Sequence, residues 1–171
     1  MLPGKDTDKG PVLFSKIFGL FPGLLQEVSQ LRGSNFFVNK NKDVDSIVVR
    51  LSGDSGDGIQ LMGSQFAVST ALSGADFATF PDFPAEIRAP VGTTFGVSAY
   101  QINLGGGPIT TAGDSPDVLV AFNPAALRVS LPLLHKGALL IINNDGFTPR
   151  SLSKAGYDSD PREDGSLSDF Q

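Results

Sequence analysis

The chain has 171 residues, a formal net charge of −5 and no cysteine, and 40% of its residues are hydrophobic. This length predicts one domain with a core of its own, and the missing thiols exclude disulfides, a cysteine nucleophile and any cysteine-ligated zinc or iron–sulfur centre in this chain. A single histidine excludes a multi-histidine metal site. Residues 158–169 hold five acids and one base, so most of the negative charge lies there and the rest of the chain is nearly neutral, without a basic patch for nucleic acid.

Residues 1–45 are predicted to form an N-terminal extension. Apolar residues recur there at spacings of three and four, which marks one face of a helix: Phe14, Phe18, Phe21, Leu25, Val28 and Leu31. Pro22 kinks or splits this helix, and its apolar face either docks on the core or meets a partner subunit. Residues 32–45 read as a linker. The apolar run is too short and too interrupted for a membrane span or a targeting signal, so we expect no membrane contact and a cytoplasmic location.

A strand, a glycine-rich loop and a helix follow in that order. Residues 46–52 form a β-branched run typical of a buried strand, and GDSGDG, residues 53–58, ends it. Helical spacing of apolar residues then runs to Leu72, and Gly74 is a typical helix terminator. This succession predicts the opening of a βαβ unit.

The rest of the chain alternates strands and turns. Residues 75–80 are a weaker strand candidate, residues 81–92 a proline-rich loop, and residues 97–104 a strand with different environments on its two faces. A buried strand is predicted over 118–122, followed by a helix that Asn123 caps and Pro124 begins. Because of Pro132, the sequence does not fix the residue at which this helix ends. Residues 138–142 form a last buried strand. The order predicts an α/β fold: a Rossmann-like open, mostly parallel sheet with flanking helices, plus the N-terminal helical extension.

The glycine loop, residues 53–58, is the best candidate for a ligand site. Its glycines let backbone amides approach a phosphate, and the following helix offers free N–H groups at its positive end. The spacing G-x-x-G-x-G matches neither the dinucleotide fingerprint nor the Walker pattern, and the two aspartates would repel a bare phosphate. They would instead accept from ribose hydroxyls, hold a cation or cap the helix, and a purely structural turn remains the alternative. The predicted contacts are Gly53, Ser55, Gly56, Asp57 and Gly58, with Gly56 the most sensitive because a side chain there would obstruct the ligand or forbid a positive φ.

Other polar residues carry weaker hypotheses. Glu86 and Arg88 lie in a proline-stiffened loop, residues 83–90, that suits a docking face or a ligand clamp, or else a solvated surface pair. Asp76 follows Gly56 at the sequence spacing typical of the acid that binds the ribose in dinucleotide folds, and the alternative is a surface role. His135 is predicted to be a solvent-facing cation. The Gly56-Asp57-Gly58 triplet occurs in thiamine diphosphate sites, but residues 80–90 lack the asparagine that would complete a magnesium site. We predict no catalytic residue and no metal site in this chain.

Four stretches together resemble a known family. They are VRLSGDSGDGIQLMGSQF, TFPDFPAEIRAPVGTTFGVSAYQI, GDSPDVLVAFNPAAL and LIINNDGFTPRSLSKAGYD. In this order they look like the N-terminal gamma domain of the alpha subunit of 2-oxoacid:ferredoxin oxidoreductases, closest to the 2-oxoglutarate type. The resemblance implies that residues 46–157 form an incomplete gamma domain and that residues 158–171 are an acidic tail. The family's pyrimidine-binding domain, with its Tyr-Pro-Ile-Thr-Pro motif, has no counterpart here, so the chain resembles a truncated product or fragment.

The resemblance also implies a function. Such enzymes oxidatively decarboxylate a 2-oxoacid such as 2-oxoglutarate on thiamine diphosphate, pass the electrons through iron–sulfur chemistry to ferredoxin, and deliver the acyl group to coenzyme A. Thiamine diphosphate, magnesium and the iron–sulfur cluster are then expected in the whole enzyme but not in this chain, and thiamine diphosphate is expected on a beta subunit. This domain would contact coenzyme A and the catalytic domains. The isolated chain is expected to be inactive. The alternative is a stand-alone nucleotide- or coenzyme A-binding domain, or an assembly domain, without catalysis.

Overall fold

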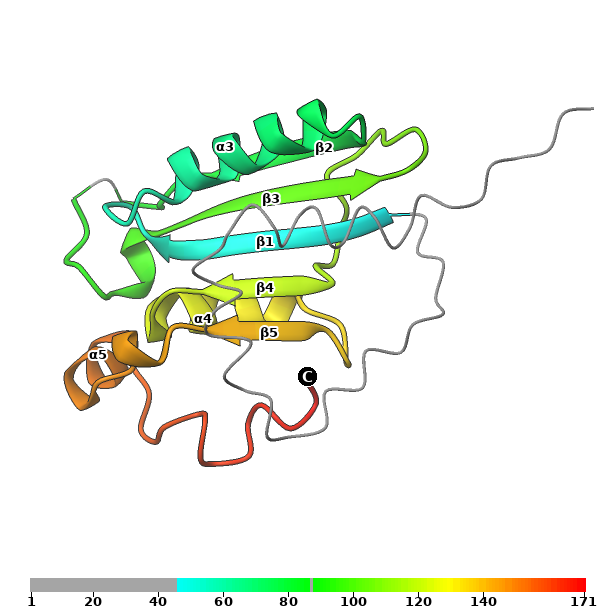
Figure 1. Ribbon diagram of the computed structural model, residues 1–171. Coiled ribbons are helices and arrows are strands. Elements are labelled where there is room, and N and C mark those ends of the chain that lie inside the picture. The colour runs from blue at the N-terminus through cyan, green and yellow to red at the C-terminus, as the bar shows by residue number, and fades with distance from the viewer. Residues whose placement is uncertain (1–45, 87) are drawn as a thin grey trace, which may run out of the picture.

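One open sheet of five strands organises the chain. The computed structural model describes residues 46–86 and 88–171, so the predicted helix and linker within residues 1–45 lie outside the described part. The spatial order of the strands is β2-β3-β1-β4-β5 (Figure 1). Their bounds are Ser46–Asp54 for β1, Asp76–Asp82 for β2, Val97–Gly105 for β3, Val118–Ala121 for β4 and Leu139–Ile142 for β5.

Strand direction confirms a mostly parallel sheet and changes one detail. β1, β4 and β5 are parallel neighbours, whereas β3 pairs antiparallel with both β1 and β2, so only β3 runs against the other four. β3 therefore lies between β1 and β2, and the predicted βαβ unit is split by an inserted strand. Leu51, in the middle of β1, sits opposite Tyr100 on one side and Val120 on the other.

Two helices cover opposite faces of the sheet. α3 (Ile59–Leu72) packs Phe66 on Ile102 of β3, while α4 (Pro124–Ser130) reaches the other face, where the Ser130 hydroxyl donates to the Ser52 hydroxyl at 2.9 Å. Successive strand residues point to opposite faces, and Leu51 packs beneath α3. The chain thus changes faces between β1 and the neighbouring β4, which is the topological switch point where open α/β sheets bind ligands.

The helix ends form as the sequence predicts. Gly58 is the N-cap residue of α3 with φ of 75°, and Gly74 follows its end with φ of 78°. The Asn123 side chain accepts a hydrogen bond from the Ala126 amide at 2.8 Å, and α4 gives way to a 3-10 turn at Leu131–Leu133 because Pro132 cannot continue an α-helix. A further helix, α5 (Pro149–Ala155), follows β5.

The polar face of β3 is covered rather than solvated. One face carries Ile102 and Leu104 under α3, and the other carries Gln101 and Asn103, as the alternating pattern predicts. All nine residues of β3 are nevertheless buried. The Gln101 side chain donates to the Gly113 carbonyl at 2.6 Å and that of Asn103 to the Thr111 carbonyl at 2.9 Å. The side-chain amides of Gln101 and Asn103 therefore hold the loop after β3 against this face of the sheet.

Residues 158–171, predicted as an acidic tail, pack against the domain. Pro161 is buried, and the last residue pairs with the edge of β5: Gln171 donates to the Ala138 carbonyl at 3.1 Å and accepts from the Leu140 amide at 2.9 Å. Among the described residues, no helix has the length and apolar character to cross a membrane.

Candidate functional site

The glycine loop lies at the carboxyl edge of the sheet, at the switch point between β1 and β4. Gly53 and Asp54 are still part of β1, and residues 55–58 form an exposed turn into α3. The structure therefore brings the five predicted contacts together where a ligand would meet both the strand ends and the start of a helix.

The three glycines have different reasons to be glycine. Gly58 adopts the left-handed φ of 75°, which favours glycine, and a Cβ atom on Gly53 would crowd the buried Ile59 side chain, at 2.8 Å from its Cδ1. Gly56 has neither constraint, because its φ is not left-handed and a Cβ there would meet nothing within 4 Å. Of the two reasons predicted for a glycine at position 56, the positive φ is thus wrong, and the obstruction of a ligand by a side chain stays a prediction.

Asp57 closes the turn instead of capping α3. Its Oδ2 accepts from the Asp54 amide at 2.9 Å, while its own amide donates to the Asp54 carbonyl at 2.9 Å. No side chain caps α3 at Gly58, so the capping alternative for Asp57 is wrong. The Ser55 amide donates to the Gly96 carbonyl at 3.1 Å, and Ser55 is exposed.

Asp54 is the residue at this edge that the sequence did not single out. It is only 7% exposed, and its Oδ2 accepts from the Gly92 amide at 2.9 Å. Its Oδ1 is buried and receives no hydrogen bond from the described part of the chain. Burial, followed by the negative charge of Asp57, raises the pKa of Asp54 against the opposing effects of Gly92, Asn123 and Lys154. Asn123 is close enough to act on that pKa, but it makes no bond of acceptable geometry to Oδ1.

These groups define what the edge can bind. Within residues 46–86 and 88–171, the amides of Gly56 and Gly58 donate to no acceptor, and the first turn of a helix leaves further amides free. They suit phosphate oxygens. Asp54 Oδ1 is buried, so only a hydroxyl or amide donor that reaches beneath the loop could bond it. The nearby Lys154 ammonium is bonded to the Val91 carbonyl at 3.1 Å. Binding here would therefore depend on backbone amides more than on a cation.

The loop of residues 83–90, which we call the docking loop after its predicted role, follows β2 and is described except for residue 87. Glu86 and Arg88 are exposed and form no ion pair with each other, and the Glu86 amide donates to the Phe95 carbonyl at 3.2 Å. The segment that follows is tied to the glycine loop by the Gly92 and Gly96 bonds. Phe83 and Phe95 expose 68% and 61% of their surface, so the docking loop presents aromatic as well as charged groups.

Asp76 and His135 lie at the other edge of the sheet. Asp76 pairs with Gly105 at the start of β2, a strand length of about 25 Å from the glycine loop, and its carboxylate accepts from the Phe77 and Ile109 amides. The ribose-binding alternative for Asp76 is therefore wrong. The exposed His135 bonds Asp117 Oδ1 at 3.1 Å, and its pKa is raised by the Lys136 carbonyl and by Asp117, in agreement with a surface cation.

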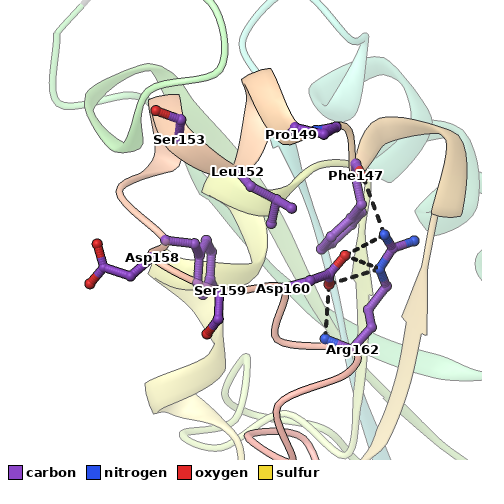
Figure 2. A pocket seen from close by; sticks show the side chains of 9 residues that line it. Phe147, Pro149, Leu152, Ser153, Asp158, Ser159, Asp160 and Arg162 are labelled. Carbon is purple, nitrogen blue, oxygen red and sulfur yellow. Dashed lines mark hydrogen bonds and ion pairs between the residues drawn. The ribbon is translucent and has the colours of Figure 1, made fainter.

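A hollow of about 570 Å³ opens beside α5, away from all the predicted contacts (Figure 2). Arg162, the cation among its described lining residues, bonds the Asp160 carboxylate at 2.5 Å and the Phe147 carbonyl at 3.2 Å, and lies 5.1 Å from the centre of the Phe147 ring. With its guanidinium engaged and Asp158 also on the wall, this hollow does not suit a phosphate. No group of three or more potential metal ligands occurs in the described ranges.

Comparison with known proteins gives a consistent result. Residues 48–165 match the family model described as pyruvate ferredoxin/flavodoxin oxidoreductase. The 2-oxoglutarate oxidoreductase subunit KorA of Mycobacterium tuberculosis is 53% identical over 127 residues, which is 74% of this chain and 19% of that protein. The chain therefore spans about a fifth of this curated relative.

Two solved structures are also similar. The 2-oxoglutarate:ferredoxin oxidoreductase from Magnetococcus marinus, with 2-oxoglutarate, coenzyme A and succinyl-CoA bound, aligns with a TM-score of 0.55 and 26% identity over 71% of this chain and 18% of that chain. A keto/oxoacid ferredoxin oxidoreductase gamma subunit from Geobacter sulfurreducens aligns with a TM-score of 0.47 and 22% identity, over 62% of this chain and 57% of that one.

Proposed function

Because the chain belongs to the pyruvate ferredoxin/flavodoxin oxidoreductase family, we propose that it is one domain of a multi-subunit 2-oxoacid:ferredoxin oxidoreductase. The proposed reaction is the oxidative decarboxylation of 2-oxoglutarate to succinyl-CoA with reduction of ferredoxin. The observation that carries the proposal is the 53% identity over 127 residues to a subunit of a 2-oxoglutarate oxidoreductase. Residues 46–157 would form a gamma-type domain, with 1–45 as an extension and 158–171 as an acidic segment packed on it.

We propose that the glycine loop contacts coenzyme A, whose thiol accepts the acyl group in the reaction. The amides of Gly56 and Gly58 would hold its phosphate oxygens, and Asp54 Oδ1 would accept from a hydroxyl or amide of the ligand. Gly53 and Asp57 would keep the loop in shape, and Ser55 would lie at its open side. These residues bind and orient, and none is placed as an acid, base or nucleophile.

The other cofactors of the reaction are proposed to lie outside this chain. Without a cysteine, the chain has no thiolate to ligate an iron–sulfur cluster. The carboxylate of Asp57 is used by the Asp54 amide and, within residues 46–86 and 88–171, is not part of a cluster of metal ligands, which does not fit a local thiamine diphosphate–magnesium site. A beta subunit would carry thiamine diphosphate, and ferredoxin would meet the complex, in the cytoplasm, rather than this domain.

The docking loop would meet a partner domain of the same enzyme. Its exposed Phe83 and the neighbouring Phe95 offer apolar area, and Glu86 and Arg88, which form no ion pair within the described ranges, offer charges of both signs. Aromatic residues and arginine are the side chains most often found at the centres of protein interfaces. We place the contact with the thiamine diphosphate-bearing subunit here.

A single substitution tests the ligand role of the glycine loop. Gly56→Val fits the fold, because its Cβ atom would meet nothing within 4 Å, but it places a branched side chain where a ligand would lie. In calorimetric titrations of the assembled enzyme with coenzyme A, this variant should weaken binding by at least about tenfold, or about 1.4 kcal/mol.

The matched control is Gly106→Val. Gly106 is also exposed, without left-handed φ and without neighbours within 4 Å, but it follows β3 at the opposite edge of the sheet. It should bind coenzyme A like the unsubstituted chain. If Gly56→Val bound coenzyme A as tightly as the unsubstituted chain, the loop would be a structural turn. That result would favour the second candidate function, an assembly domain, which the hydrogen bonds between Asp54 and Asp57 that close the turn also support.

A further inference from the structure

The outward face of α3 carries no charge and exposes three large apolar side chains beside the polar Ser64 and Gln65. Among its 14 residues there is no acidic, basic or histidine side chain. Leu61, Val68 and Leu72 expose 67%, 52% and 84% of their surface, and their spacing of seven and four residues aligns them in one stripe. The Ser64 hydroxyl within this stripe turns back to the Gln60 and Leu61 carbonyls at 2.8 and 3.0 Å. Large apolar side chains that are aligned and exposed on a helix face without charges are typical of a face that another segment covers.

The chain enters the domain next to this stripe. Ser46, the first residue of β1, and Asp76, the first residue of β2, both pair with Gly105 of β3. They therefore lie two strand spacings apart, about 10 Å. Leu72, at the end of α3, comes only four residues before Asp76. Whatever precedes Ser46 thus approaches the domain beside the most exposed leucine of the stripe.

We propose that residues 12–31 of the same chain cover this stripe of Leu61, Ser64, Val68 and Leu72. This 20-residue segment carries six apolar residues at helical spacing and only two charges, Lys16 and Glu27, so its composition matches the uncharged α3. Residues 32–45 span up to about 46 Å when extended. α3 is about 21 Å long, so the whole stripe is within reach.

An intrachain occupant is favoured over a second copy. A segment joined by a linker of this length is present at an effective concentration in the millimolar range, which a separate chain does not reach under ordinary conditions. The exposed surface of the stripe is confined to one helix, which is small for a stable dimer interface. The proposal does not depend on the coenzyme A site, which lies at the opposite end of α3.

The absence of native cysteine allows a direct test on the full chain. Leu72→Cys and Leu61→Cys would each be labelled with a benzophenone maleimide, irradiated and mapped by mass spectrometry. Val129→Cys is the control, because Val129 is an exposed apolar residue on α4, which covers the other face of the sheet. Crosslinks into residues 12–31 should form from positions 72 and 61 at least about tenfold more than from position 129, because docking holds the segment locally.

Isotope mixing separates the possible occupants. In an equal mixture of ¹⁵N-labelled and unlabelled chains, the proposal requires crosslinks within one isotopic species. Crosslinks between the two isotopic species would assign the stripe to a second copy. The proposal would also be overturned if residues 12–31 were crosslinked no more from positions 72 and 61 than from position 129, or not at all. The double variant Phe18→Asp and Phe21→Asp should abolish the crosslink from position 72, and its persistence would contradict an apolar contact. Circular dichroism checks that each variant is folded.

Discussion

Two aspartates three residues apart in the glycine loop have different roles. Asp57 is engaged with the Asp54 amide and stabilises the turn, whereas Asp54 is buried with one oxygen unsatisfied. An unpaired polar atom in a buried position costs stability, and such atoms occur where a ligand or partner completes the bonding. The two residues can therefore be separated by experiment.

Asp54 should make the domain less stable as the pH rises. Its pKa is raised in the folded chain above the ordinary 3.8, mainly by burial, so the folded chain binds this proton more readily than the unfolded chain. The free energy of unfolding then falls as the pH rises from below 3.8 through the raised pKa, and the loss persists at neutral pH. Asp54→Asn removes the charge and should raise the free energy of unfolding at pH 7 by about 1 kcal/mol.

Urea unfolding between pH 3.5 and 7 measures this effect. The difference between Asp54→Asn and the unsubstituted chain should shrink toward the acidic end of the range. Asp114→Asn, at an exposed position, is the control and should leave the profile unchanged. Parallel profiles for Asp54→Asn and the unsubstituted chain would show that burial of Asp54 does not matter for folding.

At the scale of the elements, α3 is placed by a close approach to β3. A Cβ atom on Gly63 would lie 2.1 Å from Tyr100 Cγ, so only glycine fits between the helix and this strand. Tyr100 is 8% exposed and packs with Leu51 and Ile59. The position of α3, and with it the orientation of the glycine loop at its start, depends on this contact.

Gly63→Ala should therefore destabilise the domain. In an exposed helix this change gains about 1 kcal/mol from helix propensity, but the clash with Tyr100 should reverse the sign and cost about 1–3 kcal/mol. Ser64→Ala, one residue along on the outer face, tests propensity without the clash and should stabilise by about 0.5 kcal/mol or less. Chemical denaturation of both variants decides between packing and propensity, and a stabilised Gly63→Ala would contradict the close approach.

Local signals were sufficient for most elements but not for their pairing. The β-branched run of β1, the Asn123-Pro124 helix start and the loop between β1 and α3 are each encoded within a few residues, and each was predicted. The insertion of antiparallel β3 beside β1 was not, because neighbouring residues do not specify which strands pair. Both aspartates of the loop were considered as ligand acceptors, but Asp54 was not among the predicted contacts, because its buried position involves Gly92, 38 residues away. A positive φ was one of two reasons offered for Gly56, but it belongs to Gly58, since spacing alone does not distinguish turn positions.

At the scale of the whole molecule, the docking loop connects the domain to the rest of the proposed enzyme. Arg88→Ala should weaken association with the partner subunit by about 1 kcal/mol or more. It should change the free energy of unfolding of this chain by no more than about 0.5 kcal/mol, because the side chain is exposed. Arg150→Ala, exposed on α5, is the control. Unchanged association in Arg88→Ala would leave Glu86 and Arg88 as a solvated surface pair.

Activity measured with and without the partner subunits tests the central claim most directly. The full chain purified alone, and the complex purified from its native cells through a tag on this chain, would be assayed with 2-oxoglutarate, coenzyme A, thiamine diphosphate, magnesium and a viologen acceptor. A chain without cysteine has no cluster to carry electrons, so the chain alone should reduce no acceptor, whereas the complex should reduce it in a reaction that requires both 2-oxoglutarate and coenzyme A. Sustained reduction by the chain alone, or a complex without this activity, would contradict the account.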